Sequence, residues 1–362
     1  MFAQLPPRER RFPSRTKAPA LRRAPPRGRS TDMVQKKDGQ PLPGTSYRVL
    51  RRIGAGSCSE VFEVTGRRGQ LRALKLLRAM HEGSSEIGAR LVQEGRALSA
   101  LNHPHIVKVE EVGVTSDGRP FLVMPRLFGE TMRERLDARG PLATPTAVHI
   151  AIQVLGGLAA THRAGIVHRD IKPANVFLAQ ASCAEQGVAD LESAPGVPEA
   201  EHAVLIDFGI AKVSREGLEP STGSNVLGTP RYLSPEQIRG EEVDARTDVY
   251  AVGLLLFEAI TGRGPFPVVD SMAVMRAHLN TPAPRLRSLL WVPPALDHAV
   301  ARALEKDPGL RWQTADAMAA ALAEALGEGG GRETPAHGGA GRAAPPDGER
   351  SARAHLAVGE AR

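Results

Sequence analysis

The chain contains 362 residues, enough for one large domain with tails or for two to three small domains. Its apolar content of 41% supports a substantial core, and its two cysteines, Cys58 and Cys183, provide neither a disulfide framework nor the spacing of a metal site. No stretch approaches the roughly 20 apolar residues that span a bilayer, so we expect a cytoplasmic protein without a membrane span.

The net charge of +7 is concentrated in an N-terminal tail. Residues 1–40 contain eleven Lys and Arg against three acidic side chains, so the rest of the chain is close to neutral. The tail is rich in proline and lacks apolar periodicity, and we therefore expect residues 1–46 to be disordered. A solvated leader, an arm for an acidic partner or membrane surface, and a transit peptide remain open, and a start at Met33 would remove most of the tail. Nucleic acid is disfavoured because no aromatic residues are interleaved with the basic ones.

A glycine turn lies between two predicted strands, residues 47–53 and 60–64. Strand, glycine turn and strand is the arrangement of a loop that covers phosphates, whereas a dinucleotide-binding turn would lead into a helix. Gly54 and Gly56 allow the backbone to approach a phosphate closely. A turn of this kind is more often a simple hairpin, so its interpretation depends on the elements that follow.

The next predicted strand, residues 71–77, carries Lys75 among apolar neighbours. A helix follows, in which Leu91, Leu98 and Leu101 recur on one face. Glu94 shares that face, which is unusual for a charged side chain unless it has a buried partner. We therefore take Glu94, ahead of Glu86, as the candidate partner of a buried cation. The helix stops at residues 102–105, and strands are expected over 106–114 and 120–124.

An amphipathic helix over residues 147–162 leads to the segment His-Arg-Asp-Ile-Lys-Pro-Ala-Asn at 168–175. The carboxylate of Asp170 can accept the proton of an attacking hydroxyl, and Lys172 can neutralise charge on a moving phosphoryl group. The amide oxygen of Asn175 can hold a magnesium ion. An acid, a lysine and an amide at this spacing therefore suit phosphoryl transfer.

The rest of the chain alternates short strands and helices. Strands are expected over 176–178 and 203–206, separated by an acidic surface insertion at 180–202. The second strand leads into Asp-Phe-Gly at 207–209, and Gly-Thr-Pro-Arg-Tyr-Leu-Ser-Pro-Glu occupies 228–236. A helix from Asp248 to residue 260 is apolar on every side and must be buried. Helices continue to about residue 326, and residues 327–362 read as a second disordered tail.

Six motifs in this order, over residues 47–326, resemble the protein kinase superfamily, and within it the bacterial serine/threonine kinases of the eukaryotic (Hanks) type. The resemblance implies an α+β, bilobal fold. Its small N-lobe, residues 47–125, would be rich in β-structure with one main helix. Its larger C-lobe, residues 129–326, would be mostly helical. The implied reaction is transfer of the γ-phosphoryl group of ATP to protein hydroxyls, with Mg²⁺, or Mn²⁺ in its place, as the cofactor ion.

The resemblance also implies roles for individual residues. Lys75 would contact the phosphates and pair with Glu94, Asp170 and Lys172 would act on the acceptor, and Asn175 and Asp207 would hold the metal. Glu236 would pair with Arg311, and Asp248 would have a structural role in the large lobe. The residues implied in ATP binding are Ile53, Gly54, Ala55, Gly56, Ser57, Cys58, Ser59, Glu60, Val61, Ala73, Lys75, Met124, Pro125, Leu127 and Phe177.

Three positions depart from the family pattern. Ser59 stands in place of the third glycine of the phosphate loop, which implies a stiffer loop. Pro125 follows Met124, the residue at the gatekeeper position, and lacks an N–H, but the adenine contact there needs only its carbonyl. Ser234 replaces a more frequent alanine, which is a change between small residues.

Regulation is implied by Arg169, directly before Asp170. Kinases with this arginine are commonly switched by phosphorylation of the activation segment, since a phosphate supplies about −1.5 to −2 charge for charge-assisted hydrogen bonds. We expect autophosphorylation at Ser221 or Thr222, in trans if the protein dimerises, and unidentified proteins as substrates. The alternative from another class is a pseudokinase scaffold, which the retention of Lys75 and Asp170 disfavours.

Overall fold

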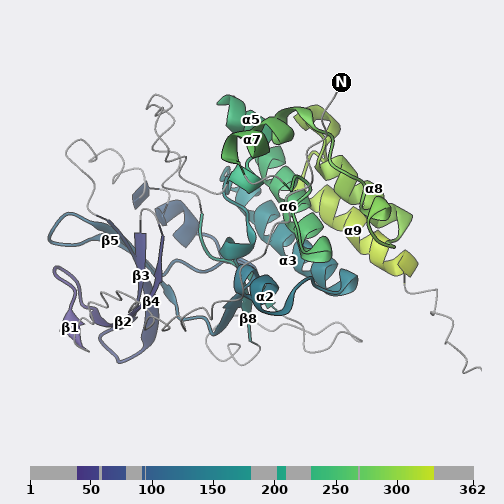
Figure 1. Ribbon diagram of the computed structural model, residues 1–362. Coiled ribbons are helices and arrows are strands. Elements are labelled where there is room, and N and C mark those ends of the chain that lie inside the picture. The colour runs from purple at the N-terminus through teal and green to yellow at the C-terminus, as the bar shows by residue number, and fades with distance from the viewer. Residues whose placement is uncertain are drawn as a thin grey trace, which may run out of the picture.

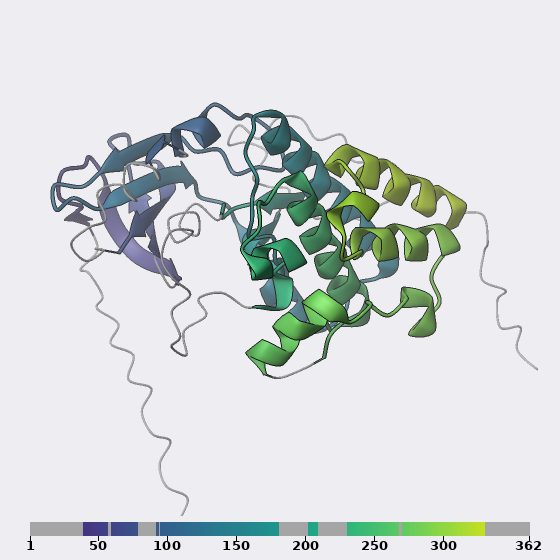
Figure 2. The same ribbon diagram turned by 90° about the horizontal axis from the view of Figure 1, so that it is seen from above.

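The computed structural model describes residues 39–56, 59–78, 92–93, 95–180, 202–208, 230–267 and 270–329. Figure 1 shows a part built of strands, which comes first in the chain, beside a larger part built of helices. Figure 2, seen from above, shows the same two parts, joined by the chain that follows β6. The α+β, bilobal architecture that the sequence predicts is confirmed.

The N-lobe contains an antiparallel sheet of six strands in the order β1-β2-β3-β4-β6-β5. The strands are β1 (Gln40–Pro41), β2 (Arg48–Ala55), β3 (Ser59–Thr65), β4 (Leu71–Leu77), β5 (Glu111–Val114) and β6 (Pro120–Pro125). Alternate residues of β3 and β4 face two different apolar clusters, as a strand with two covered faces requires. The register places Val61 opposite Lys75 and Ala73 opposite Met124.

The structure describes residues 39–46, which were expected to belong to a disordered tail, and that expectation is wrong for these residues. Strand β1 pairs with β2, and Leu42 is only 1% exposed. Leu42 packs in the cluster that contains Phe62 and Val64, and its N–H donates to the carbonyl of Tyr47 at 2.9 Å. Its burial depends on side chains of β2, β3, β4 and β6, most of which are distant in sequence, so no local sequence pattern reveals it.

The strand expected over residues 106–114 is also shorter in the structure, because β5 begins at Glu111. The residues before it turn towards the C-lobe. Val107 donates its N–H to the carbonyl of Leu205 at 2.9 Å, and Ile106 and Leu205 form an isolated parallel bridge. This segment therefore ties the lobes together instead of extending the sheet.

The C-lobe consists mainly of helices and also contains a three-stranded sheet in the order β7-β8-β9. The strands are β7 (Gly129–Thr131), β8 (Val176–Ala179) and β9 (His202–Leu205). The helices are α2 (Met132–Arg139), α3 (Thr144–Arg163), α5 (Pro235–Arg239), α6 (Ala245–Thr261), α7 (Ser271–Asn280), α8 (Pro294–Ala303) and α9 (Ala315–Gly329). The predicted insertion runs from Gln180 to His202, but the structure places His202 in β9, and residues 181–201 lie outside the described part of the chain.

Helix α6 is the central element of the C-lobe, as its apolar sequence predicts, and residues 247–260 are all buried. It begins at Ala245, three residues before the Asp248 start expected from the sequence, because the side chain of Asp244 caps it by accepting the N–H of Arg246. It ends at Gly262, whose φ of 75° suits glycine. Asp248 is thus left inside the first turn, with its carboxylate available for the catalytic segment.

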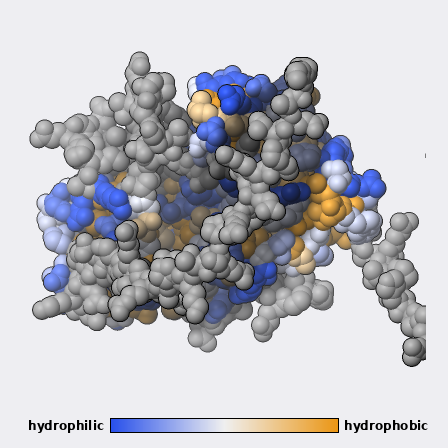
Figure 3. Space-filling model, viewed as in Figure 1, coloured by the Kyte–Doolittle hydropathy of each residue, from blue (hydrophilic) through white to orange (hydrophobic). Residues whose placement is uncertain are grey.

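Helix α9 runs three residues beyond the boundary expected at 326. Figure 3 shows an area of hydrophobic colour over this part of the C-lobe. In α9 itself, Ala320 and Ala323 are exposed. Within the described ranges, no helix is both long and apolar enough to cross a membrane.

Candidate active site

The catalytic segment, residues 168–175, is held in shape by the carboxylate of Asp248, which was expected only to have a structural role in the large lobe. Its Oδ2 accepts the N–H of His168 at 2.8 Å, and its Oδ1 accepts the N–H of Arg169 at 2.9 Å. The Nε2 of His162, at the end of α3, lies 2.7 Å from the same Oδ2. Asp248 is fully buried, so these contacts replace the water it has lost.

Arg169 adopts a φ of 64°, the only positive φ of a residue other than glycine in the described part of the chain. This left-handed conformation is costly for any residue with a side chain. It is kept only where contacts with the surrounding structure hold the backbone in place. Sequence patterns gave no sign of this turn.

Asp170 lies in a tight group with the two residues predicted to act beside it. Its Oδ2 accepts a hydrogen bond from Lys172 Nζ at 2.8 Å and another from Asn175 Nδ2 at 3.0 Å. The same amide nitrogen donates to the carbonyl of Asp170 at 2.7 Å. The short 3₁₀ turn Pro173–Asn175 brings Asn175 back towards Asp170.

The lysine of β4 reaches the C-lobe, where Lys75 Nζ lies 2.8 Å from Asp207 Oδ1. Glu94, the partner implied by the family resemblance, lies outside the described residues. Asp207 is next to Asn175, since Asn175 Nδ2 donates to the carbonyl of Asp207 at 3.3 Å and the N–H of Ile206 donates to the carbonyl of Asn175 at 3.1 Å. The structure thus brings together Lys75, Asp170, Lys172, Asn175 and Asp207.

His168 is a buried support for this group that was not among the predicted site residues. Its ring lies 4.6 Å from that of Phe208, between centroids, and its Nδ1 accepts the N–H of Asp170 at 3.3 Å. Burial lowers the pKa of His168, which keeps the imidazole neutral and its Nδ1 lone pair available. The histidine therefore acts through its shape and one acceptor atom.

The residues predicted to surround adenine form part of one apolar cluster between the lobes. Ala73 and Met124 are buried in it, and four partly buried side chains pack against it: Ile53, Val61, Leu127 and Phe177. Gly54, Ala55 and Gly56 lie at the end of β2, opposite Ser59, Glu60 and Val61 of β3, and the N–H of Gly56 donates to the carbonyl of Ser59 at 2.8 Å. Ser57 and Cys58, at the tip of this turn, lie outside the described residues.

Residues 125–127, which form the hinge between the lobes after Met124, are anchored by the buried carboxylate of Glu63. Sequence patterns gave no sign of this role. Glu63 accepts hydrogen bonds from Arg51 Nε at 3.0 Å and from Arg126 Nε at 2.9 Å. The hydrogen bond from Arg51 is the main reason why the pKa of Glu63 lies below its ordinary value. Arg126 follows Pro125 directly, so this bridge fixes the hinge to β3.

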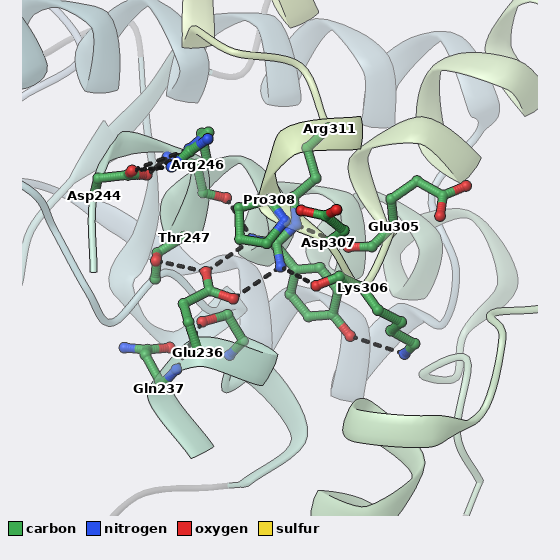
Figure 4. A network of polar contacts seen from close by, with 12 residues as sticks. Glu236, Gln237, Asp244, Arg246, Thr247, Glu305, Lys306, Asp307, Pro308 and Arg311 are labelled. Atoms are coloured by element: carbon green, nitrogen blue, oxygen red, sulfur yellow. Dashed lines mark hydrogen bonds and ion pairs between the residues drawn. The ribbon is translucent and has the colours of Figure 1, made fainter. Parts of the chain in front are cut away.

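The predicted pair Glu236–Arg311 is confirmed and is fully enclosed. Two parallel contacts of 2.8 Å join the guanidinium to the carboxylate, and Thr247 Oγ1 donates to Glu236 Oε1 at 2.7 Å. Figure 4 shows this group between α5, the start of α6 and the turn before α9. Burial alone would raise the pKa of Glu236, but the hydrogen bonds from Arg311 and Thr247 outweigh it and hold the pKa below its ordinary value.

Helix α5 begins with a capping box, which the pattern Ser-Pro-Glu-Gln at 234–237 would have indicated. The N–H of Gln237 donates to Ser234 Oγ at 3.3 Å, and the N–H of Ser234 donates to Gln237 Oε1 at 3.0 Å. The amide nitrogen of Gln237 also donates to the carbonyl of Arg169 at 2.9 Å. Of the predicted regulatory residues, Arg169 lies in this region, whereas Ser221 and Thr222 are outside the described residues.

Comparison with known proteins identifies the family. A family model described as "Protein kinase domain" matches residues 47–322. The serine/threonine-protein kinase PknL of Mycobacterium tuberculosis is 38% identical over 285 residues, which are 78% of this chain and 66% of that protein. PknB of Mycolicibacterium smegmatis is 36% identical over 282 residues, which are 76% of this chain and 42% of that protein.

Among solved structures, the PknI kinase domain of Mycobacterium tuberculosis is similar with a TM-score of 0.59 and 27% identity, covering 80% of this chain and 98% of that one. The chain spans less than half of PknB and 66% of PknL. The family match, the shared fold and the relatives named serine/threonine-protein kinases agree with the motifs, and this chain belongs to the protein kinase family.

Proposed function

We propose that this protein is an active serine/threonine kinase, which transfers the γ-phosphoryl group of MgATP to protein hydroxyls. Family membership alone does not carry this proposal, because a kinase fold can serve as a scaffold without catalysis. The observation that carries it is the joined set of contacts from Lys75 through Asp207 and Asn175 to Asp170. This set joins the residues to which the family resemblance assigns roles at the phosphates, the metal and the acceptor.

Asp170 is the residue proposed to receive the hydroxyl proton of the protein substrate. Its carboxylate is held by Lys172 and Asn175, and its backbone by His168, so its direction is set before a substrate arrives. A base that is already oriented spares the reaction the cost of ordering it. Lys172 is also placed to neutralise charge on the transferred group.

Asn175 and Asp207 are the residues proposed to hold the metal. Each offers a hard oxygen donor, which suits Mg²⁺ or Mn²⁺. The two hydrogens of the Asn175 side-chain nitrogen are directed to three nearby oxygens of Asp170 and Asp207, which leaves the carboxamide oxygen for an ion beside Asp207. When bound, the ion neutralises the phosphate charge. Lys75 is placed for the same phosphates, since it extends from β4 and already contacts the carboxylate of Asp207.

The adenine ring is proposed to enter the cluster of Ile53, Val61, Ala73, Met124, Leu127 and Phe177. Such a site would match the usual composition of nucleotide pockets, mostly apolar with a few polar groups. The carbonyl of Pro125 and the N–H of Leu127 would supply the polar contacts. The hinge bridge between Glu63 and Arg126 supports this, because it holds these backbone groups in place.

The activation segment is proposed to carry the switch. Phosphorylation at Ser221 or Thr222 would add charge near Arg169 and order the segment. The protein would modify its own segment, in trans within a transient dimer, and then act on other protein substrates.

The test is incubation of the purified full chain with ATP and Mg²⁺, followed by mass spectrometry of the protein and of an added general substrate, myelin basic protein. We expect phosphoserine or phosphothreonine on both, and no phosphate on either when EDTA replaces Mg²⁺. Absence of phosphate on both proteins with the metal present would contradict the proposal.

A further inference from the structure

The peptide group between Arg169 and Asp170 is fixed at both of its ends. Its N–H, which belongs to Asp170, donates to His168 Nδ1 at 3.3 Å, and its C=O, which belongs to Arg169, accepts from Gln237 Nε2 at 2.9 Å. A peptide group is planar, so two opposite contacts determine how the plane is turned. The direction of the plane in turn sets where the side chain of Asp170 begins.

This plane needs external support because it follows the left-handed turn of Arg169, whose φ is 64°. On one side of the turn, the carboxylate of Asp248 in α6 accepts the N–H groups of His168 and Arg169. Gln237 of α5 is the described side chain that holds the carbonyl on the other side. If the Gln237 side chain were removed, no contact from α5 would keep the peptide group from turning to another orientation.

The carboxamide of Gln237 is itself oriented by the capping box. Its oxygen accepts the N–H of Ser234 at 3.0 Å, and its nitrogen faces the carbonyl of Arg169. Exchange of the two amide atoms would place an acceptor against a carbonyl and a donor against an N–H, so only the observed orientation satisfies both partners. The amide is therefore committed to this bridge.

The backbone beneath Gln237 is also fixed. The preceding residue, Glu236, is 3% exposed and bound to Arg311 and Thr247 in the network of Figure 4. Because the backbone at Gln237 is fixed in this way, its side chain has little freedom to move relative to the carbonyl of Arg169.

We propose that Gln237 is a positioning residue for phosphoryl transfer. It connects the segment 230–234, which closes the activation segment, to the peptide plane that aims Asp170. This role rests on the proposed kinase function. Gln237 would not touch ATP or the transferred group, so its loss should lower kcat and leave the KM for ATP unchanged.

Three variants of the full chain separate this role from simple stabilisation of α5. Gln237→Glu retains the acceptor for Ser234 N–H but loses the donor to Arg169. Gln237→Met loses both contacts. Ser234→Ala, the matched control, loses the capping hydroxyl and retains both contacts of the Gln237 amide. For each, kcat and KM for ATP are measured with myelin basic protein as acceptor, together with the melting temperature.

We expect kcat to fall about 3- to 10-fold in both Gln237 variants, as the loss of one net hydrogen bond implies. The KM for ATP should stay within about twofold of wild type, and Ser234→Ala should retain wild-type kcat despite a lower melting temperature. Wild-type kcat in Gln237→Glu, or a kcat that follows melting temperature across all three variants, would overturn the positioning role alone. An inactive wild-type protein would overturn the proposed function and this inference together.

Discussion

Arg311→Met should be among the most destabilising single substitutions in this protein. The arginine is 0% exposed and the carboxylate of Glu236 is 3% exposed. The guanidinium also donates to three backbone carbonyls, those of Glu305, Arg246 and Lys306. Methionine fills similar space but supplies no donor, so the substitution leaves a buried carboxylate with Thr247 as its remaining side-chain partner.

Removal of one partner from a buried ion pair typically costs about 3–5 kcal/mol, because the remaining charge is neither solvated nor paired. One kcal/mol corresponds to roughly 2–4 °C for domains of 150–250 residues, so the melting temperature should fall by about 6–20 °C. Thermal and urea unfolding of the two proteins measure the difference. The double variant Glu236→Leu with Arg311→Met should recover part of the loss, since it removes the isolated charge.

Arg163→Ala is the matched control, because Arg163 pairs with Asp316 at 3.2 Å while both side chains are more than 60% exposed. Exposed pairs contribute about 0–1 kcal/mol, so this variant should melt within a few degrees of wild type. If Arg311→Met were no more destabilising than Arg163→Ala, the argument that the buried pair secures α5 would be refuted.

Further measurements test other parts of the structure. Acid should expose the contribution of Glu236 to the stability of the folded protein. Folding lowers the pKa of Glu236, so its ionised carboxylate contributes fully above the ordinary pKa of 4.5. This contribution is lost as the pH falls through the lower pKa of the folded state. The melting temperature of wild type should therefore drop more steeply below pH 4.5 than that of Glu236→Gln, and parallel curves would contradict this. Leu42→Ala should cost about 2–5 kcal/mol in urea unfolding, as for other buried leucines, whereas removal of residues 1–38 should cost less than about 1 kcal/mol. Equal effects would mean that Leu42 is not part of the core. Alanine at both Ser221 and Thr222 should lower the rate of phosphate transfer. Full activity in this variant, with no phosphate between residues 213 and 227, would favour the alternative of a segment that is ordered without phosphorylation.

Much of the architecture could be predicted because it is written in local patterns. The apolar run of α6 requires burial, and the glycine turn between β2 and β3 is visible from the local order of residues. The family resemblance added the pairing of Glu236 with Arg311 across 75 positions, which no periodicity reveals.

The features that were missed depend on contacts between distant elements. Arg169 has a positive φ in a turn that Asp248 and Gln237 contact, and neither of these residues is near it in sequence. Leu42 was assigned to a tail because a single apolar residue carries no periodic signal. The capping box at Ser234 and Gln237 was readable as a pattern, but only the structure shows that the same glutamine reaches the catalytic segment.

The most direct test of the central proposal compares wild type with Asp170→Asn in two assays, binding of ATP and the rate of phosphate transfer. The proposal assigns Asp170 to the acceptor side of the site. Asp170 contacts Lys172 and Asn175, while Lys75 contacts Asp207. Nucleotide affinity should therefore remain within a few-fold of wild type. Transfer should fall by about 10²- to 10⁴-fold, the usual contribution of a general base. Wild-type transfer rates in Asp170→Asn, or loss of ATP binding in proportion to the loss of transfer, would contradict the assignment of Asp170 as the catalytic base.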